Sequence, residues 1–134
     1  MDTTEYFKLQ TKNDILYLKL KNRWNNMVAE TIGDTFKEQY AKAVDGFNGI
    51  PFYSLIELAP EFKPVDTKVK ELMSFGMKYS NTHNLVRSVQ IMPDALQRIG
   101  LQDAAQNANH DHFRIVVASL EEGLQKIEEL KGLS

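Results

Sequence analysis

Cysteine is absent from the 134 residues of the chain, and this absence removes several kinds of chemistry at once. Disulfide bonds, thiolate metal ligands and cysteine nucleophiles are all excluded. No apolar run approaches the ~20 residues that a membrane-spanning helix needs. Residues 1–5 also lack the basic and apolar regions of a signal peptide. We therefore expect a cytoplasmic protein.

An excess of charge of either sign is missing as well. Lys and Arg total 16 against 18 Asp and Glu, which gives a formal net charge of −2. Without a basic excess, general binding to nucleic acid is disfavoured. Hydrophobic residues make up 43% of the chain, and a chain of this length suits one domain with its own core. We expect residues 1–134 to form a single domain that needs no cofactor.

The sequence also lacks the common catalytic motifs. It has seven glycines, yet no Gly-x-Ser-x-Gly elbow and no glycine-rich phosphate loop can be drawn from them. His110, Asp111 and His112 look like metal ligands, but no further ligand pattern accompanies them and the stretch reads as a polar loop. We expect neither an enzyme nor a metal site.

The pattern of apolar residues gives the elements that are present. Residues 6–10 and 15–21 alternate as strands, and Lys12-Asn13-Asp14 between them is typical of a hairpin turn. Apolar residues then recur every three or four positions from Ile32 to Phe47, which predicts a helix of four or five turns. Three further strand–helix units follow, with strands at 52–58, 85–92 and 113–118 and helices at 66–79, 94–108 and from 119 onward.

This order predicts an α/β fold with a five-stranded mixed, mostly parallel sheet, an N-terminal β-hairpin and four helices. Arg87, Ser88 and Gln90 in one strand and Arg114 in the last are unusual for a sheet covered on both faces. They predict helices largely on one face. The expected core includes Phe36, Tyr40, Ile56, Leu72, Ile91, Ile115 and Leu124.

A β-hairpin followed by β-α units, with Leu55-Ile56-Glu57-Leu58-Ala59 leading to Val65-Asp66-Thr67, resembles the STAS domain. That is the fold of the bacterial anti-sigma-factor antagonists and of the cytoplasmic domains of sulfate transporters. The lipid-carrying CRAL-TRIO domains have a related architecture. The likeness covers roughly residues 5 to 131 and is nearest to small, free-standing bacterial members with no assigned role.

The resemblance implies a site at the third strand and the helix after it. In regulatory members an acidic residue lies near the end of the central strand, and Glu57 matches that position loosely. A phosphorylated Ser follows an Asp at the start of the next helix, where this chain has Asp66-Thr67, followed by Lys68-Val69 in place of Ser-Gly. Thr67 is therefore a candidate phosphoacceptor. The alternative that we favour is that Asp66 or Thr67 caps the helix.

Two aromatic residues follow neighbouring parallel strands. Trp24 comes after the second strand and Phe62, beside Lys63, after the third. Loops at the carboxyl ends of parallel strands form the binding edge of open α/β sheets, and aromatics among polar residues are typical of interaction hot spots. Alternatively, the rings fold back over the helix layer.

We therefore expect a non-enzymatic module that binds a partner protein or a small ligand through Trp24, Phe62, Glu57 and Lys63. The alternative is a carrier of a lipid or other apolar ligand, by similarity to CRAL-TRIO domains. A homodimer is a further option.

Overall fold

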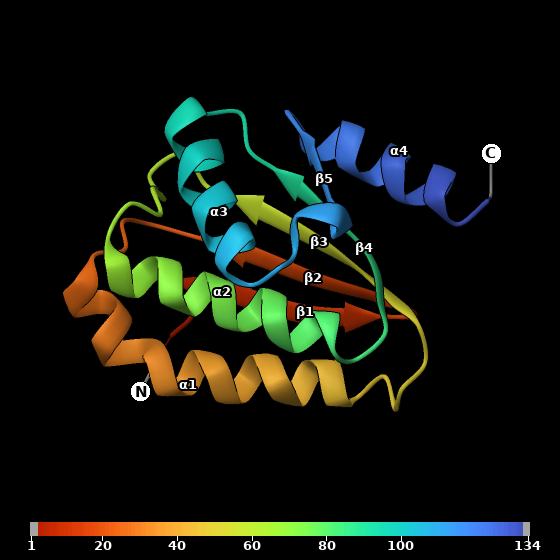
Figure 1. Ribbon diagram of the computed structural model, residues 1–134, viewed down its shortest axis with the longest axis horizontal. Coiled ribbons are helices and arrows are strands. Elements are labelled where there is room, and N and C mark those ends of the chain that lie inside the picture. The colour runs from red at the N-terminus through yellow and green to blue at the C-terminus, as the bar shows by residue number, and fades with distance from the viewer. Residues whose placement is uncertain (1–2, 133–134) are drawn as a thin grey trace.

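The computed structural model describes residues 3–132, and its elements follow the expected order (Figure 1). Two strands come first, and strands and helices then alternate, with one short 3-10 turn before the last strand. The elements are β1 (Phe7–Lys12), β2 (Ile15–Leu20), α1 (Asn26–Asp45), β3 (Phe52–Leu58), α2 (Thr67–Asn81), β4 (Leu85–Ile91), α3 (Ala95–Asn107), η1 (Asp111–Phe113), β5 (Arg114–Val117) and α4 (Leu120–Leu130).

The strands form one sheet in the order β1-β2-β3-β4-β5. β1 runs antiparallel to β2, with Phe7 opposite Leu20, and every other neighbouring pair is parallel. The hairpin turns at Asn13, whose φ of 56° lies in the left-handed region that asparagine tolerates. The predicted topology, including the antiparallel first strand, is confirmed.

The helices cover the two faces of the sheet unequally. Figure 1 shows α1, α2 and α3 in front of the sheet, whereas α4 packs on the opposite face. A Cβ on Gly123 of α4 would lie 3.1 Å from Leu55 and 3.2 Å from Ile91, so this helix sits close on β3 and β4. Right-handed crossovers place helices that link parallel strands on one face. α4 follows the last strand and links nothing, so that rule does not apply to it.

The larger core lies between the sheet and α1–α3, and a smaller one lies under α4. Phe36, Tyr40, Ile56, Leu72 and Ile91 are buried as expected. Two expected core residues are not: Ile115 is only half-buried, and Leu124 is 50% exposed. β5 is an edge strand, and α4 turns Gly123 and Ile127 toward the sheet instead of Leu124.

The polar strand residues correct part of the argument that predicted this layering. Ser88 and Gln90 lie on the covered side and are 1% exposed. There Ser54 Oγ donates to Ser88 Oγ at 2.8 Å, and Arg114 Nε donates to Gln90 Oε1 at 2.8 Å. These residues therefore signal a buried polar network, not a solvated face. Only Arg87 lies on the α4 side, where its Nε donates to the Phe113 carbonyl.

Candidate functional site

Trp24, in the loop from β2 to α1, is buried and not exposed to solvent. Its side chain is 3% exposed, and its indole Nε1 donates to the Lys21 carbonyl at 2.9 Å. The ring meets Phe36 edge to face at 5.8 Å between centroids and Phe62 at 5.2 Å. Of the two interpretations that the sequence left open for Trp24, the structure has the one in which the ring folds back over the end of the helix layer.

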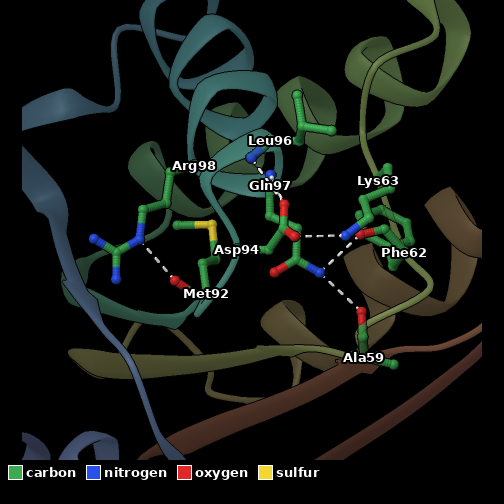
Figure 2. A network of polar contacts seen from close by, with 8 residues as sticks. All are labelled: Ala59, Phe62, Lys63, Met92, Asp94, Leu96, Gln97 and Arg98. Atoms are coloured by element: carbon green, nitrogen blue, oxygen red, sulfur yellow. Dashed lines mark hydrogen bonds and ion pairs between the residues drawn. The ribbon is translucent and has the colours of Figure 1, made fainter.

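Phe62 lies in the loop from β3 to α2 and is fully buried. The Gln97 side chain of α3 fixes this loop, as Figure 2 shows: its Nε2 donates to the carbonyls of Ala59 and Phe62, both at 2.8 Å. The sequence therefore predicts correctly that Trp24 and Phe62 meet, but not that they meet inside the molecule. Both rings form the end of the core, and whether they also support partner binding stays a prediction.

An open groove of about 550 Å³ lies between these two loops at the carboxyl edge of the sheet. We call it the carboxyl-edge groove; it is lined by Arg23, Trp24, Asn25, Pro60, Glu61, Lys63, Val65 and Asp66. Most of these residues are exposed or half-buried, and Trp24 is the exception because it is buried. Two of the residues expected from the sequence, Trp24 and Lys63, thus line a common groove.

Lys63 ties the rim of the groove to α3. Its Nζ lies 2.8 Å from Asp94 Oδ2 (Figure 2), and Asp94 also accepts hydrogen bonds from the amides of Leu96 and Gln97 as the cap of α3. The hydrogen bond from Lys63 and these two amides hold the pKa of Asp94 below its usual value. The pair is partly exposed, so its main effect is to orient the loop.

Exposed apolar side chains stand on the segments around the groove. Val65 is 52% exposed and Met27, in the first turn of α1, is 68% exposed. Leu96 and Ile99 on α3 are 54% and 61% exposed. Next to Ile99, Gly100 approaches the loop so closely that a Cβ would lie 2.2 Å from the Pro64 oxygen. This glycine lets the buried face of α3 pack closely on the β3–α2 loop, while Leu96 and Ile99 of the same helix stay exposed.

The first turns of α1 and α2 are bonded to each other. The Asn26 amide donates to Asp66 Oδ2 at 3.1 Å, and the Lys68 amide donates to Asn26 Oδ1 at 2.9 Å. Asp66 occupies the cap position of α2 without a side-chain bond to that helix. The favoured interpretation is therefore right about the position of the cap, which is Asp66, but the side-chain hydrogen bond to the first turn of α2 comes from Asn26. Thr67 is exposed, and within residues 3–132 its hydroxyl makes no hydrogen bond.

Glu57 lies apart from this site. It points to the α4 side of the sheet, where its Oε1 accepts a hydrogen bond from the Tyr17 hydroxyl at 2.7 Å. Partial burial and this carboxylate raise the pKa of Tyr17 to about 12. Glu57 is not among the residues that line the carboxyl-edge groove, because alternate residues of a strand point to opposite faces.

Sequence reasoning missed a buried polar cluster between the sheet and the helices. His110 is 1% exposed, in contrast to the polar loop expected there. Its Nδ1 lies 2.6 Å from Asn81 Oδ1, and its Nε2 has no hydrogen-bond partner in the structure. The ring borders a small cavity of about 30 Å³ that Ser54, Ser80 and Gln90 also line. The signal in the sequence was the set of polar residues in strands that otherwise read as buried.

Among residues 3–132 no group of three or more His, Asp or Glu side chains could hold a metal ion. Within the same range no helix is long and apolar enough to cross a membrane. The carboxyl-edge groove is a surface with fixed loops and with apolar and charged side chains that are accessible to a partner.

Comparison with known proteins supports the fold. No protein-family model and no curated protein sequence matches the chain. Among solved structures it is similar to the Bacillus cell fate determinant SpoIIAA in its phosphorylated form, with a TM-score of 0.55 and 15% sequence identity. The match covers 90% of this chain and 98% of that one. The predicted STAS-like fold is therefore confirmed, and at this identity the likeness concerns the fold alone.

Proposed function

We propose that this chain is a non-enzymatic, cytoplasmic binding module that engages a partner protein through the carboxyl-edge groove. The observation that carries the proposal is an open groove between loops that are already fixed. Gln97 holds two carbonyls of the β3–α2 loop, and Lys63 is paired with Asp94. A surface ordered before binding loses little conformational entropy when a partner docks. The STAS-like fold is consistent with such a role.

The composition around the groove also favours a protein partner. Protein interfaces combine an apolar centre with a polar rim. Val65 supplies exposed apolar area in the groove itself, beside the charges of Arg23 and Glu61. Leu96 and Ile99 add exposed apolar area on α3, the helix that packs on the β3–α2 loop. The buried rings of Trp24 and Phe62 support these loops from below, so the part that we assign to them is to hold the groove in shape.

The apolar-carrier alternative draws no support from the small cavity inside the main core. Within the described residues, the cavity between the sheet and α1–α3 measures about 30 Å³ and is lined partly by serines and His110. A space of this size holds a water molecule or two, whereas pockets for organic ligands measure about 300–1,000 Å³. We therefore base the proposed binding function on the carboxyl-edge groove and not on this cavity.

Replacing Val65 with Asp should abolish partner binding without unfolding the protein. Val65 is 52% exposed, so the substitution costs little packing, but it places a charge where the groove has an apolar side chain. The matched control is Ile50→Asp, because Ile50 is 62% exposed before the opposite end of β3. Each tagged variant is expressed in the native cells and the proteins that co-purify are compared. A protein retained by wild type and Ile50→Asp, but lost from Val65→Asp, supports the proposal; equal recovery from both variants contradicts it.

We further propose Thr67 as the residue at which phosphorylation regulates this module. SpoIIAA, the structural neighbour, was solved in a phosphorylated form. Thr67 is exposed at the first position of α2, and it borders Asp66 of the groove. A phosphate would be stabilised by the helix dipole. It would also add about −1.5 to −2 charge beside Asp66 and so change the electrostatics of the groove.

Thr67→Ala should change the free energy of unfolding by less than about 0.5 kcal/mol, as expected for an exposed side chain without a hydrogen bond. Asn26→Ala is the control, and losing its cap of α2 should cost about 1 kcal/mol. Urea denaturation of both variants measures these effects. Mass spectrometry of protein from native cells then tests the modification itself: phosphate on Thr67 supports regulation there, and its absence under all growth conditions contradicts it.

A further inference from the structure

One part of the sheet is uncovered on the face that carries α4. α4 packs against Leu55 of β3 and Ile91 of β4, and its C-terminal end reaches only the start of β2, where Lys131 pairs with Asp14, so β1 and the rest of β2 extend beyond it. Two strands are about 10 Å wide, and six residues of strand are about 20 Å long. That area matches one short helix, which has a diameter of about 10 Å with its side chains. α4 itself, with 11 residues, is such a helix.

The boundary between α4 and the uncovered strands is an apolar groove. Its volume is about 710 Å³; Ile15, Tyr17 and Leu55 of the sheet line it together with Leu124 and Ile127 of α4. Leu124 is 50% exposed there, and Leu120, one turn earlier, is 37% exposed. Exposed leucines in a row along one side of a helix mark a surface that is stabilised when another surface covers it, because apolar area is then removed from water.

The uncovered strands carry three lysines that form no ion pair within the described chain. Lys8, Lys12 and Lys19 point to this face, and within residues 3–132 none of them forms an ion pair. Lys8 lies directly opposite Lys19 in the β1–β2 register. Like charges opposite each other destabilise a sheet. Glu57, the neighbour of Lys19 on β3, accepts instead from Tyr17.

α4 carries the complementary charge on its outer face. Glu121, Gln125 and Glu128 follow one another at spacings of four and three residues, so they share a face of the helix. All three are exposed. Neither glutamate forms an ion pair within the described chain, in contrast to Glu129, which is paired with Lys126.

We propose that a second copy of this chain binds this face, so that the α4 helices of two copies lie side by side between the two sheets. A two-fold axis that runs parallel to both helices brings Leu124 of each copy together. Each α4 then covers the bare β1–β2 strip of the other copy. Glu121 and Glu128 of one copy face Lys8, Lys12 and Lys19 of the other.

A second copy fits better than an unrelated helix because the surface is self-complementary. The bare strip of β1 and β2 needs a short helix with one apolar side and one acidic face. α4, which lies beside the strip, has this length and both of these surfaces. A two-fold arrangement makes every contact twice and closes on itself, as interfaces between identical subunits do. The surface lies on the opposite face of the sheet from α1–α3, so it leaves the carboxyl-edge groove free for a partner.

Analytical ultracentrifugation of the full chain tests the proposal. At about 100 µM, a concentration at which a micromolar dimer is nearly complete, we expect a particle of twice the chain mass of 15.4 kDa. Leu124→Asp should raise the dimer dissociation constant about thirtyfold or more, as loss of a central interface residue does. Leu96→Asp, at a leucine of similar exposure on α3, should leave it unchanged. A monomeric wild type, or a dimer indifferent to Leu124→Asp, overturns the proposal.

A charge exchange separates this interface from general loss of folding. Glu121→Lys with Glu128→Lys should weaken the dimer, because lysines would then face lysines. Adding Lys8→Glu and Lys19→Glu to the same chain restores opposite charges at two of the three lysine positions and should restore most of the dimer. The weakened variant should keep the circular dichroism of wild type, since all four residues are at the surface or half-buried. A quadruple variant that stays monomeric while folded contradicts the proposed pairing.

Discussion

Replacing Trp24 with alanine will lower the free energy of unfolding by about 3–5 kcal/mol, the range for large aromatic residues removed from a core. The ring is 3% exposed and meets Phe7, Phe36 and Phe62 edge to face. Its removal leaves a cavity where the two carboxyl-edge loops meet the helix layer. It also leaves the Lys21 carbonyl without its indole donor.

Urea denaturation followed by circular dichroism measures this loss, with Trp24→Phe as the control. Phenylalanine keeps most of the packing and loses the hydrogen bond to Lys21, so it should cost about 1–2 kcal/mol. A loss below about 1 kcal/mol for Trp24→Ala would mean that the indole is a displayed binding residue, as the sequence alone permitted.

The second large effect is a loss of stability in mild acid caused by His110. Burial, with smaller contributions from the charges of Arg114 and His112, lowers the pKa of this imidazole from 6.5 to about 4. Above pH 6.5 the ring is neutral in both the folded and the unfolded chain, so its titration does not affect stability there. As the pH falls from 6.5 toward 4, the unfolded chain takes up a proton that the folded chain does not. Stability should therefore drop by about 3 kcal/mol in this window.

His110→Gln isolates this effect from the carboxylates that titrate in the same range. Glutamine has a similar length and can keep a hydrogen bond to Asn81, but it does not titrate. The pH dependence of unfolding free energy between pH 7 and 4 should be shallower in the variant than in wild type by most of that amount. Parallel pH profiles for the two proteins would show that His110 is hydrated or paired, and that the small cavity beside it does not exclude charge.

The fold was predictable because periodicity, turns and caps agree with the packing. The alternation in the hairpin, the continuous apolar run of β3 and the cap at Asp94 each indicate one local structure, and the structure has all three. Leu124 was wrongly predicted to be in the core, because the leucines of α4 do not all lie on one side of the helix and the sequence does not show which side faces the sheet. The small residue Gly123 lets one side approach the sheet, and a spacing rule does not detect this.

The candidate site was predictable in its position and not in its exposure. The rule that parallel strands end at one edge correctly brought Trp24, Phe62 and Lys63 together. Whether an aromatic in a loop points outward depends on partners that are distant in sequence, such as Gln97, whose side chain bonds the β3–α2 loop from α3. For the same reason, sequence spacing did not show that Asn26 caps α2 across 42 residues.

Site-specific photo-crosslinking tests partner binding at the carboxyl-edge groove most directly. A photoreactive amino acid replaces Val65 in one variant and Ile50 in another, and each protein is irradiated inside its native cells. Both positions are more than half exposed, so both can react with a neighbouring protein. The account predicts a discrete cross-linked partner from position 65 and none from position 50. Cross-links of equal yield from both positions, or from position 50 alone, would contradict it.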